Sequence, residues 1–175
     1  MSMYFSNLNN VRKYLLDQKV EVEWCSFFPA NYYVEWLKSS DSKKYLRIRS
    51  FKEGWFGTSL GAKTKSIGSI DLDIDPTNNI VRVPFWLCND KSLAKLCGGR
   101  FDGEPIDDNT ANEVKTILFD YADKIAKENN CKVIQRDVHN NLREFNEEIK
   151  QFGFELTGEK ASDNPFWLVS TKSIN

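Results

Sequence analysis

Three aspartates at every second position are the first residues whose types and spacing could do chemistry. Asp71, Asp73 and Asp75 alternate with apolar residues, so a strand here would present its carboxylates on one face. An ionised carboxylate can position an amine or take its proton, and an ammonium is not nucleophilic until that proton is removed. Asp73 is therefore a candidate general base. The alternative is that the three carboxylates form a solvated strand face.

The single histidine of the chain is a second candidate. His139 directly follows a predicted strand, Lys132–Val138, and precedes Asn140-Asn141. An imidazole is suited to proton transfer near neutral pH, which makes His139 a candidate catalytic residue; the alternative is a surface turn. Asn141 either contacts a ligand or caps the helix that follows it.

Two surface features are candidates for binding. A basic cluster around the predicted strand Tyr45–Phe51 faces either a phosphate or acidic partner, or solvent. It consists of Lys43, Lys44, Arg47, Arg49, Lys52, Lys63 and Lys65. Trp55-Phe56 lie in the glycine-containing segment Lys52–Ser66, where exposed aromatic side chains would favour a protein partner. The alternative is that this segment folds back over the core.

Composition excludes several classes of protein. The chain has 24 Lys+Arg and 25 Asp+Glu, a balance that argues against a nucleic-acid binder. Its longest apolar runs have four residues, so we expect no membrane span, and Met1–Asn10 does not resemble a secretory signal. Four cysteines without a CxxC pair predict reduced thiols and no metal site. These features together predict a cytoplasmic protein.

Periodicity predicts the elements that must position these residues. The amino-terminal part contains a helix near Val11–Asp17, a strand over Val20–Trp24, a helical stretch over Asn31–Lys38 and the strand Tyr45–Phe51.

The strand Ile67–Asp75 returns through a turn into Ile80–Cys88. Pro84 in the second of these strands marks either an edge strand or a place where strand pairing is broken.

Helices and strands alternate in the carboxyl-terminal part. A helical turn over Ser92–Leu96 precedes a long helix, which the capping-box spacing of Thr110 and Glu113 introduces and Asn129-Asn130 ends. The rest comprises the strand Lys132–Val138, a helix from Asn141 to Phe152, and strands over Phe154–Thr157 and Phe166–Thr171.

This order predicts an α/β fold of the α+β type, a mixed and mostly antiparallel sheet flanked by helices. The length of 175 residues predicts a single domain over residues 1–175. Within it, residues 1–44 form a helical and strand part, and residues 45–175 form the core.

The core resembles the GCN5-related N-acetyltransferase (GNAT) family. The resemblance rests on the strand beginning Ile67-Gly68-Ser69-Ile70, the turn Asp75-Pro76-Thr77-Asn78, the long helix and strand after it, and Asn140-Asn141-Leu142 followed by Gly153-Phe154. It covers about three quarters of the chain and lies in order and spacing, since each motif alone is common.

The resemblance implies a site for acetyl-CoA or another acyl-CoA as cosubstrate. In the family, the fourth and fifth strands splay apart and free backbone groups bind the pantetheine arm. The resemblance thus implies that the pantetheine arm is contacted by Val83, Phe85, Trp86 and Leu87. It also implies that Pro84, which has no backbone N–H, fits a place where the strand pairing is open. The pyrophosphate would lie at Asn109 and Thr110, where a helix begins, with Asn141 as a further contact.

Two departures from the family pattern affect these expectations. Asp107-Asp108 precede the long helix, and two carboxylates there would repel a pyrophosphate. The helix that ends at Gly153 has Ile149 and Phe152 where family members often have a tyrosine that protonates the leaving thiolate.

Two functions remain open from the sequence. One is an N-acyltransferase in which a primary amine of a small molecule or protein attacks the acyl-CoA directly. The other is a catalytically inactive binding or inhibitory module of the same fold, which would act through protein contacts such as the Trp55-Phe56 segment. The sequence names neither the acceptor nor the acyl group.

Overall fold

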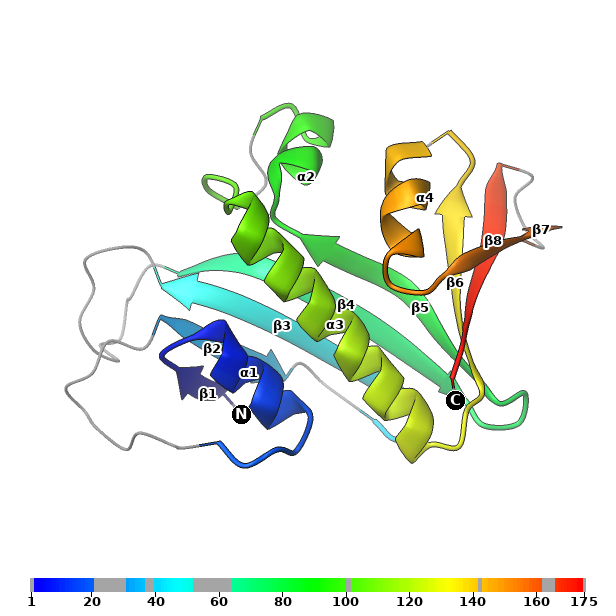
Figure 1. Cartoon of the computed structure of the whole chain (residues 1–175), viewed down its shortest axis with the longest axis horizontal. Coiled ribbons are helices and arrows are strands. Elements are labelled where there is room, and N and C mark those ends of the chain that lie inside the picture. The colour runs from blue at the N-terminus through cyan, green and yellow to red at the C-terminus, as the bar shows by residue number, and fades with distance from the viewer. Residues whose placement is uncertain are drawn as a thin grey trace. The chain divides into compact units, whose positions relative to one another are not determined.

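The computed structural model describes residues 2–20, 31–36, 40–51, 64–99, 102–141, 143–161 and 166–174 (Figure 1). Its strands are β1 (Ser2–Phe5), β2 (Tyr32–Trp36), β3 (Lys43–Phe51), β4 (Thr64–Asp75), β5 (Ile80–Cys88), β6 (Val133–His139), β7 (Glu155–Lys160) and β8 (Trp167–Ser173). Its helices are α1 (Leu8–Leu15), α2 (Lys91–Leu96), α3 (Asp108–Glu128) and α4 (Arg143–Lys150).

The strands hydrogen-bond in the order β1-β2-β3-β4-β5-β6-β8-β7. Neighbouring strands are antiparallel in the pairs β1–β2, β2–β3, β6–β8 and β7–β8, whereas β5 and β6 are parallel. A parallel pair requires a crossover connection, and α3 lies in it. The predicted fold class, a mixed and mostly antiparallel sheet flanked by helices, is confirmed.

The chain divides into two compact units, which are described separately. Unit 1 contains residues 1–39, 45–70 and 86–121, and unit 2 contains residues 40–44, 71–85 and 122–175. The prediction of a single domain with a boundary after residue 44 stays a prediction.

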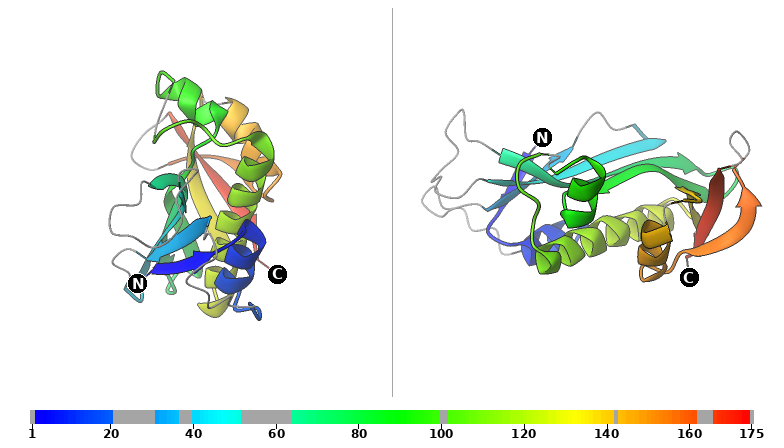
Figure 2. Two further views of the ribbon diagram at one scale, coloured as in Figure 1. Left: turned by 90° about the vertical axis from the view of Figure 1, so that its left-hand side faces the viewer. Right: turned by 90° about the horizontal axis from the view of Figure 1, so that it is seen from above.

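In unit 1, α1 and the first part of α3 lie on one face of the strands (Figure 2). Alternation along the strands and helical spacing along α3 direct apolar side chains to this side. The ring of Trp36 lies 5.6 Å from that of Tyr121, and Arg12 pairs with Asp120 at 2.6 Å. A Cβ at Gly68 would overlap Cγ1 of Val114, so the close approach of β4 and α3 requires glycine there.

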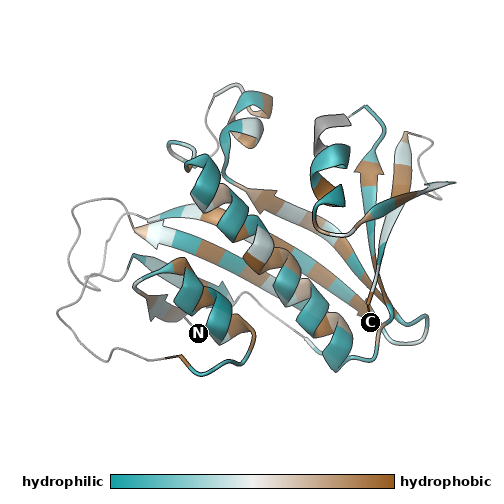
Figure 3. Ribbon diagram, viewed as in Figure 1, coloured by the Kyte–Doolittle hydropathy of each residue, from teal (hydrophilic) through white to brown (hydrophobic). Residues whose placement is uncertain are grey.

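In unit 2, β6 pairs with β8 along its whole length, from Val133↔Ser173 to His139↔Trp167. The apolar residues of β8 lie in its first part, Trp167–Val169, and the rest of the strand is polar, as the hydropathy colouring in Figure 3 shows. Lys172 on β8 reaches Asp123 on α3 at 2.7 Å. The turn that follows α4 includes Gly153, which has φ of +85°, a conformation that glycine adopts without steric cost.

One predicted element is wrong. The stretch Asn31–Lys38 was expected to be helical, but Tyr32–Trp36 form β2, with Val34 fully buried. β2 pairs with β1 on one side and β3 on the other. Aromatic side chains fit both periodicities, and the two strand partners decide the outcome in favour of the sheet.

Other predictions hold or lie outside the described residues. β3, β4, β5, β6 and both closing strands lie where they were expected, within a few residues at the ends, and the short β1 was not predicted. The strand Val20–Trp24, apart from Val20, and the residues Trp55, Phe56 and Cys25 lie outside the described part of the chain. Among the described residues, no helix is long and apolar enough to cross a bilayer.

Candidate active site

The parallel pairing of β5 with β6 covers only part of both strands. It consists of three residue pairs, from Ile80↔Val133 to Arg82↔Gln135. Beyond them the pairing ends: no further pair joins the described residues of unit 2 in Val83–Phe85 to those in Arg136–His139. Because β6 remains paired with β8 to its end, the separation exposes backbone groups on one side of β6 only.

The direction of these groups follows from one hydrogen bond. The N–H of Val133 donates to the carbonyl of Asn79 at 3.3 Å. Backbone groups alternate in direction along a regular strand, so those of Asp137 on β6 also point toward β5, where the pairing has ended. By the same alternation, the carbonyl of Val83 points toward β6.

Pro84 lies where β5 becomes irregular. Val81 and Val83 are buried and Arg82 and Pro84 exposed, as expected for a regular strand. Phe85 is then 48% exposed. The next residues in contact with α3 are even-numbered: the ring of Trp86 lies 5.2 Å from that of Phe119, and Cys88 Sγ approaches the carbonyl of Ala111 at 3.7 Å.

Burial therefore stops alternating at Pro84-Phe85, two consecutive exposed residues, and a strand tolerates proline where its pairing is irregular. Up to this point, alternation directs the nitrogen of Pro84 toward β4. The expectation that Pro84 omits a donor from the open side of β5 therefore does not follow from this register. The other expectation, that Pro84 marks broken pairing, agrees with the end of the β5–β6 pairs after Arg82. Trp86 and Leu87 follow, half-buried and buried respectively.

His139 ends β6 within an aromatic cluster. Its ring stacks on Phe166 with centroids 6.4 Å apart and meets the edge of Trp167 at 5.4 Å. The backbone N–H of Asn141 donates to His139 Nδ1 at 3.2 Å. Since Nδ1 accepts, the proton of the neutral imidazole lies on Nε2, and the free nitrogen of this tautomer is a donor and not a base.

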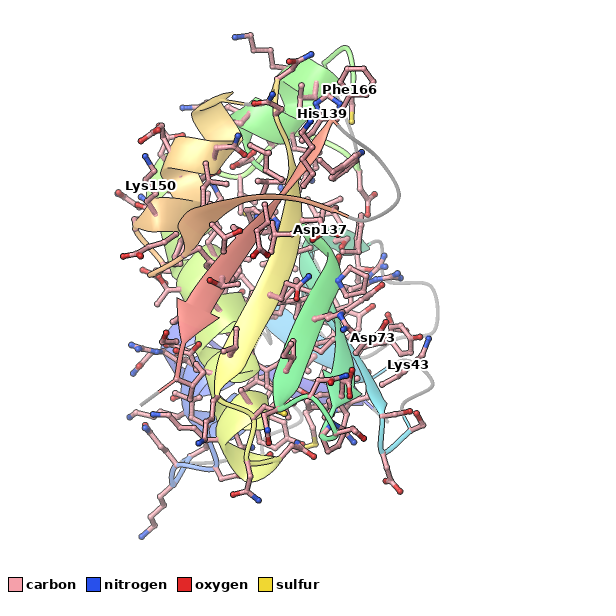
Figure 4. The ribbon with its side chains drawn as sticks, turned by 90° about the vertical axis from the view of Figure 1, so that its right-hand side faces the viewer. Lys43, Asp73, Asp137, His139, Lys150 and Phe166 are labelled. Carbon is pink, nitrogen blue, oxygen red and sulfur yellow. The ribbon has the colours of Figure 1, made fainter. Side chains whose placement is uncertain are left out.

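Asp73 lies away from His139, on β4 beside Lys43 (Figure 4). Its Oδ1 is 3.7 Å from Lys43 Nζ, and both side chains are more than a third exposed. Asp75 has a structural role, because it accepts from the backbone and the side chain of Asn78 in the turn. These hydrogen bonds, with Arg82, lower the pKa of Asp75. The predicted catalytic pair, Asp73 and His139, is thus not brought together.

The beginning of α3, in unit 1, already has a carboxylate on its amides. Asp107 Oδ1 accepts from the backbone N–H groups of Asn109 and Thr110 at 3.1 and 3.0 Å, and Oδ2 accepts from the Thr110 hydroxyl at 2.6 Å. These bonds, that of the Thr110 hydroxyl first, lower the pKa of Asp107. Asp108 pairs with Lys91 at 3.0 Å. Asp107 therefore caps α3, which begins at Asp108, and the predicted cap, Thr110, lies inside the helix.

Known proteins resemble this chain in fold and not in sequence. No protein-family model matches the chain, and no curated protein sequence matches it. Among solved structures, a nourseothricin acetyltransferase aligns over 77% of this chain and 66% of its own, with a TM-score of 0.50 and 12% identity. The fold is that of the GNAT acetyltransferases.

Two further structures are similar at lower scores. A GNAT-family acetyltransferase from Streptococcus pneumoniae aligns over 78% of this chain and 70% of its own, at a TM-score of 0.44 and 16% identity. A streptothricin acetyltransferase assigned in Bacillus anthracis, in complex with acetyl coenzyme A, aligns over 77% and 64%, at 0.49 and 15%. The chain spans just under two thirds of the length of the nourseothricin enzyme.

Two observations bear on the expected cosubstrate site. The Asp107 carboxylate accepts from the backbone amides at the start of α3, where the resemblance places the pyrophosphate. Ile149 is fully buried and has no hydroxyl. Sequence reasoning missed Asn146, a buried α4 residue whose Nδ2 donates to the carbonyl of His139 at 3.4 Å. It also missed Asp137, although its spacing of two residues from His139 was a usable signal.

Proposed function

We propose that this chain is an N-acyltransferase that moves an acetyl group from acetyl-CoA to a primary amine. The observation that carries the proposal is the end of the β5–β6 pairing after Arg82↔Gln135, next to Pro84, in a GNAT fold. An unpaired parallel edge offers backbone donors and acceptors to an extended, amide-containing arm such as pantetheine.

The residues proposed to hold the cosubstrate come from β5 and two helix starts. Val83 and Phe85, followed by Trp86 and Leu87, would bind the pantetheine arm through backbone groups and the exposed Phe85 ring. Asn109, Thr110 and Asn141 remain the proposed contacts of the phosphates and the arm. The open strand fits this role, whereas Asp107 makes the start of α3 a poor anion site, because its own carboxylate already accepts from those amides.

Acetyl-CoA supplies the acetyl group: the C–N bond forms as the C–S bond breaks, the amine loses a proton and the thiolate gains one. Asp73 or an ordered water is proposed as the base. His139 is proposed to act through Nε2–H, as a donor to an oxygen or sulfur that gains charge, since Asn141 occupies its other nitrogen.

The direct test is thermal unfolding with acetyl-CoA, longer acyl-CoAs and free CoA. A ligand at 100 times its Kd stabilises by about 2.7 kcal/mol. For a chain of this length that raises Tm by roughly 5–11 °C. If millimolar concentrations of all three ligands leave Tm unchanged, the enzyme proposal is wrong.

Phe85→Ala tests the location of the site. Phe85 is half exposed, so its truncation should change stability little. Acetyl-CoA affinity should fall about tenfold if the ligand buries roughly 50 Å² of the ring. Leu96→Ala, a truncation of another exposed apolar side chain on α2, is the control and should leave affinity unchanged. Equal affinities of Phe85→Ala and wild type would place the ligand elsewhere.

A binding or inhibitory module without catalysis is the second candidate, and Asp107 and Ile149 favour it. Its partner would be a protein, with the Trp55-Phe56 segment as the proposed contact. The double variant Asp107→Ala/Asp108→Ala separates the two functions. It should raise CoA affinity if carboxylate repulsion limits an existing CoA site, and it should leave CoA unbound if the fold no longer binds this cosubstrate.

A further inference from the structure

We propose that Asp137, His139, Phe166 and Trp167 form a binding site for an organic ammonium ion. The proposal that this site holds the amine substrate rests on the proposed acyltransferase function. The binding itself is argued from the end of β6 and the beginning of β8 in unit 2.

The register of these strands places the four residues together. His139 and Trp167 are directly opposite in the antiparallel pair, so their side chains share one face. Asp137 is two residues before His139 and lies on the same face, diagonally opposite Trp167. Ile134 and Val138, on the other face of β6, are buried, so the proposed site lies on the face opposite to the core.

The rings of Phe166 and Trp167 are held against His139 but remain partly exposed to solvent. Phe166 is 60% exposed and Trp167 37% exposed, although both contact the His139 ring. The carbonyl of Phe166 accepts from the N–H of Asn140 at 2.8 Å, which holds the two strand ends against one another. Exposed rings at a fixed separation present π faces that attract a cation within about 6 Å of the ring.

Asp137 supplies the complementary charge. It is exposed, and no basic side chain of the described residues lies within ion-pair distance of it. Figure 4 shows Lys150 directed away on α4, where it pairs with Glu147 at 2.8 Å. By contrast, Asp73 and Asp75 are each paired with a basic residue.

A carboxylate beside aromatic faces selects a ligand that carries positive charge on an apolar frame. An anion would be repelled by Asp137, and a neutral apolar ligand would leave the carboxylate without a partner. The backbone of Asp137 faces the open side of β6, so a cation held by its side chain lies next to the strand edge proposed for the pantetheine arm. An alkylammonium ion therefore fits this site.

The probe is 1,4-diaminobutane, titrated at low ionic strength into the full chain and followed by NMR of the backbone amides and tryptophan indoles. We expect the largest shifts at Asp137, His139 and the Trp167 indole. We also expect none from butane-1,4-diol, which has the same length without charge. Shifts of equal size with the diol, or shifts located elsewhere, would overturn the proposal.

Asp137→Asn removes the charge with almost no change of shape. It should raise Kd for 1,4-diaminobutane about fivefold, the range of an exposed ion pair. Glu128→Gln, at the end of α3 near the start of β6, has the same change of charge and should leave Kd unchanged. Trp167→Leu should raise Kd about threefold, and Trp167→Phe should retain most of the affinity and the fold. An Asp137→Asn variant that binds as wild type contradicts the site.

The two proposals fail separately. Amine binding without an acetyl-CoA shift would reject the acyltransferase and leave the ammonium site intact. An acetyl-CoA shift without amine binding at Asp137 would reject the ammonium site alone.

Discussion

Asp107 shows how one side chain decides whether a helix start is capped or left to a ligand. Its two oxygens accept three hydrogen bonds from Asn109 and Thr110. Each of those donors is also what a phosphate would use. The carboxylate therefore stabilises α3 and competes with an anion at the same place, and the two effects can be measured separately.

Asp107→Ala should lower the free energy of unfolding at pH 7, and the loss should depend on pH. The pKa of Asp107 is lowered from 3.8 in the folded chain, chiefly by the Thr110 hydroxyl. Its stabilisation is therefore fully present above the unfolded pKa and is lost as pH falls through the folded one. Urea titrations should show a larger loss of stability relative to wild type at pH 7 than at pH 2.5.

Asp107→Ser is the control for this prediction, since a hydroxyl caps the helix without titrating. Its stability relative to wild type should improve as pH falls. An Asp107→Ala effect of the same size at both pH values would mean that capping by the ionised carboxylate is not the cause.

The sequence predicted that a helix begins here but assigned its first residue wrongly. Thr110 and Glu113 have capping-box spacing, and nothing in the sequence ranks them below Asp107 as the start. The chain direction before the helix decides the cap, because it brings the Asp107 oxygens to the amides. That direction is a tertiary property. The same holds for Asp137: that no basic side chain of the described residues pairs with it depends on the neighbouring strands.

At the level of elements, α2 and α3 are joined by a buried ion pair. Lys115 Nζ lies 2.5 Å from Asp90 Oδ2, and the two side chains are 5% and 8% exposed. Asp90 also caps α2 by accepting from the N–H of Leu93 at 2.8 Å. One carboxylate thus serves the helix start and the contact between two helices.

Asp90→Asn should cost about 3 kcal/mol of unfolding free energy, because it removes the negative charge that contacts the buried Lys115 ammonium, while the amide still caps α2. Asp90→Ala should cost about 1 kcal/mol more, through loss of the cap. The double variant Asp90→Asn/Lys115→Met should recover most of the loss. Denaturant titrations measure all three, and a double variant less stable than Asp90→Asn would contradict the argument.

The contact between β4 and α3 gives a second prediction at this scale. Gly68→Ala should destabilise unit 1 by about 1–3 kcal/mol, because the new methyl group overlaps Val114 in a packed core. Val114→Ala makes room for it, so the double variant should lose less than the sum of the two single losses. Strictly additive losses in a denaturant titration would show that the overlap is not the cause.

Regular alternation made β4 predictable, and the same reasoning failed where partners decide. Tyr32–Trp36 contains aromatics at spacings compatible with helix or strand, and only pairing on both sides identifies β2. Pro84 was visible in the sequence as a proline within a strand. That the β5–β6 pairing ends just before it required the register.

At the scale of the whole molecule, the two units are not two consecutive pieces of chain. The division cuts β4 between Ile70 and Asp71, β5 between Phe85 and Trp86, and α3 between Tyr121 and Ala122. A strand or helix that is continuous across a division couples the stability of both sides, because half of it cannot unfold without fraying the rest.

We therefore expect the chain to unfold in one cooperative transition. Tryptophan fluorescence from Trp86 in unit 1 and Trp167 in unit 2, isolated by replacing the other tryptophans with phenylalanine, should give the same urea midpoint as far-UV circular dichroism. The all-phenylalanine variant is the control for residual signal. Separate midpoints for the two reporters would show that the units fold independently and that the single-domain prediction is wrong. Coincident midpoints would mean that a ligand bound to either unit stabilises the whole chain, so the thermal shift with acetyl-CoA reports on both.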